Sequence, residues 1–339
     1  MEKKQENEPA GRGVAMRFTK MQGCGNDYIY INGFAEKIPR EEKPQLVQRL
    51  SDRHFGIGGD GVIFINPSEE ADFEMEMYNA DGTRAQMCGN GMRCVGKYVY
   101  EKRLTDKTSF RVISGGQIKY LELFLKQEEK AAALQEGMPV SKEAQQAASE
   151  EENVSFLQKK KEAGSRRGIV EKVRVNMGKP QLVPEKIPVL AKGGSVVKMP
   201  VLIGGKGYEM TCVSMGNPHA VVFTGQVREL DLEKIGPLWE HSELFPERVN
   251  TEFAEVISPE KLFMRVWERG TGETLACGTG CCAVAVAGVL CGLTKRKVTI
   301  QVLGGELEIE WDEQTDEVFM TGPAETVFEG EIPYPFMIF

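Results

Sequence analysis

Short apolar and alternating runs follow one another along the chain and predict many strands. Residues 73–78 alternate apolar with charged side chains, which is typical of a strand that buries one face. Residues 62–65 are Val, Ile, Phe and Ile, which favour strands. The same criteria predict further strands at 17–21, 28–31, 169–175, 208–214, 220–223, 253–257, 262–266, 297–303, 306–311 and 318–321.

Helical spacing is confined to a few segments. Between residues 43 and 52, and again after Cys88, apolar residues recur at helical intervals. Residues 281–290 are apolar on every face, which is the pattern of a helix fully buried in a domain core. The pattern as a whole predicts an α+β protein made of two strand-rich domains with few helices.

Changes in composition predict the domain boundaries. Residues 1–15 are charged and polar without an apolar core, so we expect a disordered tail that is neither signal peptide nor anchor. Residues 126–168 are rich in Lys, Gln, Glu and Ala and predict a polar helical or disordered insert. The 339 residues are enough for two cores. We therefore expect an N-terminal domain over 16–125 and a C-terminal domain over 169–325.

A short element occurs twice in the chain. Cys88-Gly89-Asn90-Gly91 follows a polar turn at 79–82, and Cys277-Gly278-Thr279-Gly280 follows a polar turn at 268–272. Each element opens a segment with a helical pattern. Two copies in two halves predict a duplicated domain with pseudo-twofold symmetry.

Charge and cysteine content exclude several classes of protein. A net charge of −8 without a basic block argues against a nucleic-acid partner. No segment approaches the roughly 20 apolar residues that span a bilayer, so we expect no membrane partner. Eight cysteines without an export signal are expected to be reduced thiols in the cytoplasm. A thiol catalyst would find there the reducing compartment that it needs.

The position of Cys88 and Cys277 before helices suggests chemistry. A helix N-terminus has unpaired N–H groups and the positive end of the dipole, so we expect both thiols to have a lowered pKa. The following glycines let a ligand carboxylate approach the same N–H groups. Two facing elements would supply an acid, a base and a carboxylate clamp.

That arrangement suits inversion at the α-carbon of an amino acid. The α-proton is weakly acidic, and fixed N–H dipoles at the carboxylate would stabilise the developing carbanion. Two opposed thiols allow removal of the proton on one face and delivery on the other. The alternative is that both cysteines are ordinary core residues, as most free cysteines are. Matched flanking glycines at both positions favour the two-base interpretation.

Seven short segments carry a resemblance to a known family. They are 23–27 (GCGND), 79–82 (NADG), 88–94 (CGNGMRC), 215–219 (MGNPH), 247–250 (ERVN), 268–274 (ERGTGET) and 276–280 (ACGTG). In these segments and in their order the chain resembles diaminopimelate epimerases. The resemblance implies two pseudo-symmetric domains, each a curved sheet or barrel wrapped around a central helix. It also implies that 326–339 crosses back to complete the N-terminal domain.

The resemblance further implies an activity and roles for residues. Members interconvert LL- and meso-diaminopimelate, in lysine and peptidoglycan-precursor biosynthesis, without pyridoxal phosphate or metal, and they are often homodimers. Cys277 would take the proton from the LL isomer and Cys88 would deliver one. Glu268 and His219 would tune the cysteines. The implied carboxylate clamps are Gly89 with Asn90 and Gly278 with Thr279, and the implied substrate contacts also include Asn26, Asn79, Asn217, Asn250, Glu268 and Arg269.

One residue departs from the family pattern, and some alternatives remain. Many members have Gln where this chain has Gly61. The glycines of 56–61 match a dinucleotide fingerprint, but a predicted helix precedes them and a strand follows, so we expect a turn. Cys277, Cys281 and Cys282 do not share one helix face, which disfavours a metal site. The competing functions are a proline-type racemase and a non-catalytic thiol- or metal-binding relative.

Overall fold

The computed structural model describes residues 14–85, 88–126 and 168–335.

The strands of the first half of the chain form one continuous ladder. β1 pairs antiparallel with β2, β2 parallel with β3, β3 antiparallel with β4, β4 parallel with β6 and β6 antiparallel with β7, while β5 forms a hairpin with β4. The bounds are β1 (Val14–Gly23), β2 (Asn26–Asn32), β3 (Gly61–Asn66), β4 (Phe73–Asn79), β5 (Arg84–Ala85), β6 (Ser109–Ser114), β7 (Gln117–Lys126) and β8 (Ile169–Gly178).

The second half repeats this ladder strand for strand. β10 to β16 show the same succession of antiparallel and parallel pairs, with β14 forming a hairpin on β13 as β5 does on β4. The predicted duplication is therefore confirmed at the level of topology. The bounds are β9 (Met199–Ile203), β10 (Lys206–Ser214), β11 (Pro218–Phe223), β12 (Asn250–Ser258), β13 (Lys261–Glu268), β14 (Gly272–Thr274), β15 (Lys297–Val302), β16 (Gly305–Trp311), β17 (Val318–Gly322) and β18 (Glu325–Tyr334).

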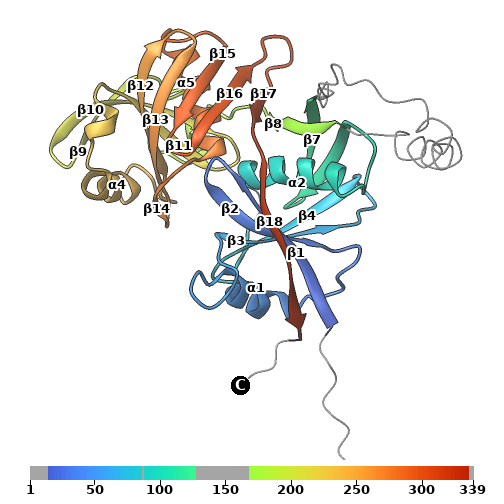
Figure 1. Cartoon of the computed structure of the whole chain (residues 1–339). Helices are drawn as coiled ribbons and strands as arrows, with labels where there is room; N and C mark the ends of the chain where they lie inside the picture. The colour runs from blue at the N-terminus through green and yellow to red at the C-terminus, as the bar shows by residue number, and fades with distance from the viewer. Residues whose placement is uncertain (1–13, 86–87, 127–167, 336–339) are drawn as a thin grey trace, which may run out of the picture.

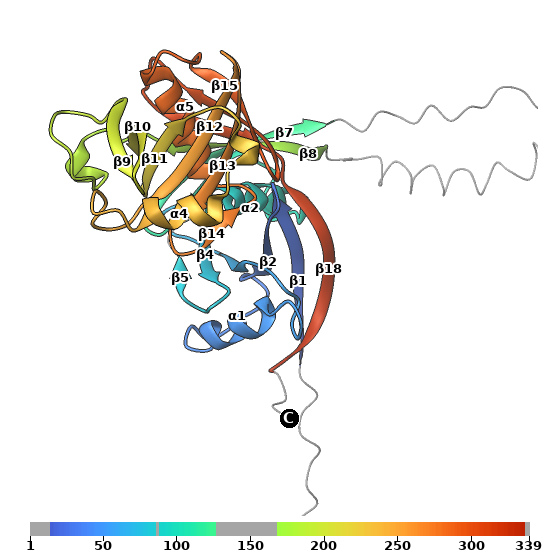
Figure 2. The same ribbon diagram turned by 90° about the vertical axis from the view of Figure 1, so that its left-hand side faces the viewer.

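Two pairings join the halves. β8 pairs antiparallel with β7 of the first half and with β17 of the second. β18, the last strand, leaves the second half and pairs antiparallel along the whole of β1, as both views show (Figures 1 and 2). β9 takes the corresponding place beside β10. The first half is thus completed by β18, which comes after the last strand of the second half. The second half is completed by β9, which comes from the connection between the halves.

Helices occupy equivalent places in the two halves. α2 (Gly89–Glu101) and α5 (Gly278–Leu290) follow the two Cys-Gly elements, and each packs against the strands of its own curved ladder. α1 (Lys43–Ser51) precedes β3 as α4 (Leu232–Glu240) precedes β12. All side chains of α5 from 278 to 288 are buried, as its apolar sequence predicts. Short 3-10 turns, η1 (Pro184–Lys186) and η2 (Val227–Glu229), lie in the second half.

One apolar core runs through both halves. Buried side chains from α2, α5 and the strands around them form a single cluster, which includes Val95, Val284 and Ile309. Two smaller clusters lie under α1 and under α4. Because the two central helices share a core, their N-termini are held in fixed relation to each other.

The sequence patterns located most elements but missed several. β5, β6, β7, β9, β14 and α4 were not predicted. Gly236 and Pro237 lie inside α4 and mask its helical pattern, because both residues disfavour helix interiors. The predicted tail over 1–15 and the insert over 126–168 lie outside the described residues apart from their end residues. No helix in the described part of the chain is long and apolar enough to cross a membrane.

Replacing Ile309 by Ala should destabilise the fold strongly. Ile309 is fully buried on β16 in the shared core, so the truncation leaves a cavity. We expect the free energy of unfolding to fall by about 2–5 kcal/mol in urea denaturation. Leu202→Ala is the control, because Leu202 is 72% exposed on β9. Its effect should stay within about 0.5 kcal/mol, and equal losses in the two variants would contradict the assignment of the core.

Candidate active site

The N-termini of α2 and α5 meet at the junction of the two halves. Cys88 is the N-cap residue of α2 and Cys277 is the N-cap residue of α5, both in extended conformation. A Cβ atom placed on Gly89 would lie 3.8 Å from the Cα of Gly278 and 3.0 Å from the Met320 methyl carbon. A methyl group here would touch the other helix end and press on the Met320 side chain, so the two helix ends lie within van der Waals reach of each other. The glycines that follow each cysteine allow the two helix ends to approach each other.

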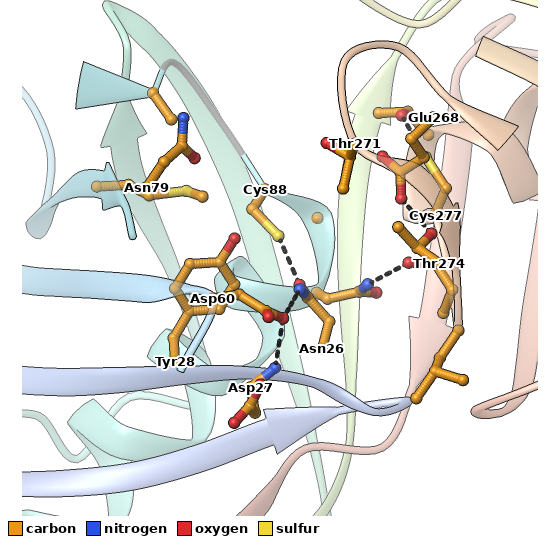
Figure 3. Close-up of a pocket in the computed structure, with 18 of the residues that line it drawn as sticks. Asn26, Asp27, Tyr28, Asp60, Asn79, Cys88, Glu268, Thr271, Thr274 and Cys277 are labelled. Carbon is orange, nitrogen blue, oxygen red and sulfur yellow. Dashed lines mark hydrogen bonds between the residues drawn. The ribbon is translucent and has the colours of Figure 1, made fainter. Parts of the chain in front are cut away.

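A cleft of about 1580 Å³ lies between the halves at this junction. In the close-up, Cys88 and Cys277 reach it from different halves (Figure 3). His219 and Asn250 do not line the cleft. The other predicted site residues all line it: Asn26, Asn79, Cys88, Gly89, Asn90, Asn217, Glu268, Arg269, Cys277, Gly278 and Thr279.

Cys88 is half-buried and its sulfur has partners on two sides. Its Sγ accepts a hydrogen bond from the Gly91 N–H at 3.3 Å, within the first turn of α2. Its thiol donates to Asn26 Oδ1 at 3.2 Å. Asn26 is itself held by Asp60, whose Oδ2 accepts from Asn26 Nδ2 at 2.6 Å. The thiol is therefore connected to both the helix end and β2.

Cys277 is buried, and its partners are different. Its Sγ lies 3.4 Å from the Thr279 hydroxyl. The Glu268 carboxylate at the end of β13 interacts with the Cys277 thiol. Glu268 also accepts a hydrogen bond of 2.5 Å from the Thr274 hydroxyl. The second thiol therefore has a carboxylate neighbour where the first has an amide.

The expectation of lowered thiol pKa values is wrong for both cysteines. Burial raises the pKa of Cys88, against a hydrogen bond from Gly91, and the negative charge of Glu268 adds to the rise. Burial likewise raises the pKa of Cys277 well above its ordinary value, and the carboxylates of Glu268 and Glu252 raise it further. Desolvation and like charge therefore outweigh the helix ends at both thiols.

A buried polar chain lies behind Cys277. His219 is fully buried, and its Nδ1 is 2.7 Å from Glu252 Oε1 while its Nε2 is 3.0 Å from Asn217 Oδ1. A Cβ on Gly280 would come within 2.6 Å of the Glu252 carboxylate, so this glycine makes room for it. No sequence pattern singles out Glu252, which is one of several charged residues in strands. A buried glutamate becomes evident only when the strands are placed.

Arg269 is exposed at the cleft and Asn250 supports it from behind. Asn250 Oδ1 accepts from the Arg269 N–H at 2.9 Å, and Asn250 Nδ2 donates to the Pro218 carbonyl at 2.9 Å. The Arg269 guanidinium donates to the Glu247 carbonyl at 2.7 Å. Asn250 therefore positions the turn that carries Arg269, and its contact with a ligand stays a prediction.

Two further asparagines differ in how fully they are engaged. Asn90 is buried, and its Nδ2 donates to the Ala276 carbonyl at 3.2 Å across the junction. Its Oδ1 has no hydrogen-bond partner within the described structure. Asn79 is exposed at the cleft, with its Nδ2 bonded to the Thr83 hydroxyl at 3.1 Å. Asn79 is therefore free to turn toward a ligand, whereas Asn90 ties the two halves together.

Gly61 could not carry a larger residue without a shift of the backbone. A Cβ at this position would lie 2.0 Å from the Tyr78 carbonyl oxygen and 3.0 Å from the ring of Tyr28. The glutamine found in many family members therefore has no place here. Tyr28, which the sequence did not single out, lines the cleft beside Gly61.

The motifs set aside from the sequence have structural explanations. Residues 56–60 lie in the connection from α1 to β3, which begins at Gly61, so a helix precedes and a strand follows, the order opposite to that of a dinucleotide site. Cys281 and Cys282 are fully buried in α5. In the described ranges, no group of three or more His, Cys, Asp or Glu side chains is placed to hold a metal ion.

Comparison with known proteins identifies the family. The family model for diaminopimelate epimerase matches residues 18–142 and 211–327. The chain is 49% identical over 317 residues to the diaminopimelate epimerase of Acetivibrio thermocellus, covering 94% of this chain and 98% of that protein. It is 48% identical to the enzyme of Agathobacter rectalis, covering 94% and 99%. It is 46% identical to an enzyme of Methanococcus maripaludis, again covering 94% and 99%.

Solved structures share the fold at low sequence identity. A probable proline racemase from Agrobacterium radiobacter superposes with a TM-score of 0.61 at 12% identity, covering 94% of this chain and 93% of that one. A phenazine biosynthesis protein of the PhzF family from Bacillus anthracis gives 0.58 at 14% identity, covering 94% and 99%. These structures support the fold, and the sequence relatives support the narrower assignment. The chain belongs to the diaminopimelate epimerase family.

Proposed function

We propose that this protein interconverts LL- and meso-diaminopimelate by a two-base mechanism with Cys88 and Cys277 as the proton carriers. The observation that carries the proposal is the meeting of two cysteine-capped helix N-termini at one cleft. Each thiol comes from a different half of a duplicated fold, so the two can address opposite faces of one carbon. No cofactor is required, because the thiols move the proton and the helix ends stabilise the charge.

The direction of reaction decides which cysteine is the base. From the LL isomer, the Cys277 thiolate removes the α-proton and the Cys88 thiol delivers one to the other face. From the meso isomer the roles exchange. A thiolate whose pKa is raised by burial is a stronger base. Its pKa is therefore closer to that of the very weakly acidic α-proton.

The substrate carboxylate at the reacting carbon would lie between the helix ends. The first turns of α2 and α5, at Gly89 with Asn90 and at Gly278 with Thr279, line this region, and N–H groups at a helix start have no partner within the helix. They stabilise an anion and, more strongly, the enolate-like charge that develops as the proton leaves. The close approach of the two glycines supports this placement.

The second amino-acid centre of diaminopimelate would lie toward Arg269. A planar guanidinium suits a carboxylate that must be recognised but not changed. Asn79, Asn217 and Asn26 line the same cleft and offer amide groups to the remaining polar atoms. Glu268 lies beside Cys277 and would adjust the pKa of its thiol. His219 lies behind Cys277 and would hold Asn217 in place at the cleft.

The competing functions have less support. Sequence identity to the proline racemase structure is only 12%, against 46–49% to diaminopimelate epimerases over nearly the full length. A proline-type substrate would also leave Arg269 without a carboxylate to bind. A thiol-based metal-binding protein would need a cluster of ligands that the described residues do not offer.

The remaining expectations from the sequence complete the proposal. We infer a cytoplasmic enzyme that works without nucleic-acid or membrane partners, and a homodimer as the family resemblance implies. Domains over 16–125 and 169–325, with 326–339 completing the first, are supported by the pairing of β18 with β1. β8 pairs into both halves, so it lies at the boundary.

The activity can be tested with purified, reduced protein in D₂O. LL-diaminopimelate without added cofactor should lose its α-proton signal in NMR spectra and yield the meso isomer. L-proline under the same conditions should keep its α-proton, because it lacks the second centre that Arg269 is proposed to bind. Absence of both exchange and meso product would remove the proposed function, and exchange with proline alone would favour the racemase.

Single replacement of either thiol should abolish inversion. Cys88→Ala and Cys277→Ala each remove one of the two proton carriers, so isomer interconversion should fall by at least about 10³-fold. Cys212→Ala is the matched control, because Cys212 is a buried thiol in the core cluster under α4. Full activity in either of the first two variants would exclude the two-thiol mechanism.

Neutralising Glu268 should shift the pH dependence of epimerisation. The Glu268 carboxylate raises the pKa of Cys277, so in Glu268→Gln this pKa should fall. The acidic limb of kcat/KM should then move to lower pH, because the thiolate form persists to lower pH. Glu233→Gln is the control, since Glu233 lines the cleft but is not among the groups that shift Cys277. A limb that stays in place or moves to higher pH would contradict this electrostatic role.

Removing the Arg269 guanidinium should weaken substrate binding more than chemistry. A charge-assisted pair contributes about 1.5–3 kcal/mol, so Arg269→Gln should raise KM for diaminopimelate about tenfold to a hundredfold. Arg17→Gln is the control, because Arg17 is exposed on β1 away from the cleft. An unchanged KM would place the distal carboxylate elsewhere.

A further inference from the structure

Cys88 must be stable in two protonation states during the proposed cycle. As the acid it is a thiol, which needs a hydrogen-bond acceptor, and as the base it is a thiolate, which needs donors. The first turn of α2 provides backbone donors, the Gly91 N–H at 3.3 Å and the Asn90 N–H. The remaining partners come from β2, a strand that the proposed mechanism otherwise uses only for substrate contact.

Asn26 is fixed as an acceptor. Its Nδ2 donates to Asp60 Oδ2 at 2.6 Å, and Asp60 is held in turn by Arg53 at 2.9 Å and by the Asp27 N–H at 3.1 Å. This short bond to a carboxylate fixes the orientation of the amide, because turning it over would place the amide oxygen against Asp60. Asn26 Oδ1 must therefore face Cys88, from which it accepts a hydrogen bond at 3.2 Å. Asn26 can thus serve the thiol but not the thiolate.

Tyr28 lies on the same face of β2 as Asn26. Side chains two residues apart on a strand share a face, and both residues line the cleft. The Tyr28 hydroxyl points toward Cys88 in the close-up (Figure 3), and it interacts with the side chains of Cys88 and Asn26. The Tyr28 side chain is almost fully buried beside Gly61, which has no side chain to displace its ring.

We propose that β2 supplies Cys88 with one partner for each protonation state, the Asn26 carbonyl oxygen for the thiol and the Tyr28 hydroxyl for the thiolate. Tyr28 remains a neutral donor, because burial and the nearby negative groups Cys88 and Asp60 raise its pKa. As the proton leaves or returns, the sulfur changes its principal partner without movement of the backbone. Tyr28 and Asn26 are therefore positioning residues for both directions of the reaction.

Other charged groups also act on Cys88. Glu268 on β13 raises its pKa across the cleft, and Arg93 on α2 lowers it. Neither group is altered by the variants used below, so their contributions stay constant. The role of these residues in catalysis rests on the proposed epimerase function. The interactions of Asn26 and Tyr28 with Cys88 can be tested without any turnover.

The experiment measures alkylation of Cys88 by iodoacetamide against pH in a Cys277→Ala background. Seven of the eight cysteines are buried and only Cys88 is partly exposed, so Cys88 is the thiol that the reagent can reach. Mass spectrometry of peptides gives the rate at this residue. The pH midpoint of the rate reports the thiolate, and the plateau at high pH reports access and intrinsic reactivity.

Tyr28→Phe should move the midpoint upward. Loss of a donor to the thiolate should reduce the alkylation rate about tenfold at pH values below the midpoint, with a plateau that is unchanged or higher. Tyr98→Phe is the matched control, because its buried hydroxyl on α2 interacts with Thr19 and not with Cys88. A midpoint that is equal in the two variants, or lower in Tyr28→Phe, would overturn the role of Tyr28.

Asn26→Ala should have the opposite sign. Loss of the acceptor removes a hydrogen bond that favours the thiol, so the midpoint should move downward while Asp60 keeps its bonds to Arg53 and Asp27. A higher midpoint would overturn the role of Asn26. Epimerisation is measured separately in the protein that retains Cys277. Failure of the shifts when that protein epimerises diaminopimelate would reject the inference alone, whereas shifts without epimerisation by that protein would reject the proposed function alone.

Discussion

The close approach of two helix N-termini is the contact on which the site depends. Gly89 and Gly278 allow it, since a side chain on either would meet the other helix end or Met320. The shared apolar core holds it, because α2 and α5 pack into one continuous cluster. Two sets of unpaired N–H groups and two capping thiols are thereby brought to one cleft. Neither half of the duplicated fold could form this site alone.

Duplication supplies equivalent positions, and divergence makes them unequal. Cys88 and Cys277 occupy the same place in the two ladders, yet one thiol faces Asn26 and Tyr28 while the other faces Glu268 and Thr279. The proposed reaction exchanges acid and base, so it needs two similar groups. The LL and meso isomers are not mirror images, so the surroundings of the two groups must differ. Equivalent thiols with different neighbours meet both requirements. The polar chain of His219 and Glu252 lies behind Cys277, where Gly280 leaves room for the Glu252 carboxylate.

The surroundings of both cysteines favour the protonated thiols. Burial raises the pKa of both cysteines more than the helix ends lower it. The helix dipole is a local effect of about 1 kcal/mol, whereas desolvation of an ion in a protein interior costs several. This balance supports the proposed role of the helix ends as a carboxylate clamp rather than as activators of the thiols. The high basicity that burial confers matches a substrate proton that is difficult to remove.

The sequence by itself determined the local features of this protein. Alternation and apolar runs located most strands and the buried helix α5. The repeated Cys-Gly-x-Gly elements revealed both the duplication and the two thiols. These signals can be read from the sequence because each is contained in neighbouring residues. Tertiary structure decided what depends on distant segments. It placed Glu252 behind Cys277, Tyr28 beside Gly61, Asn250 behind Arg269 and β18 beside β1. It also reversed the expected direction of the thiol pKa values, because burial is set by the whole fold and a helix N-terminus by only a few residues.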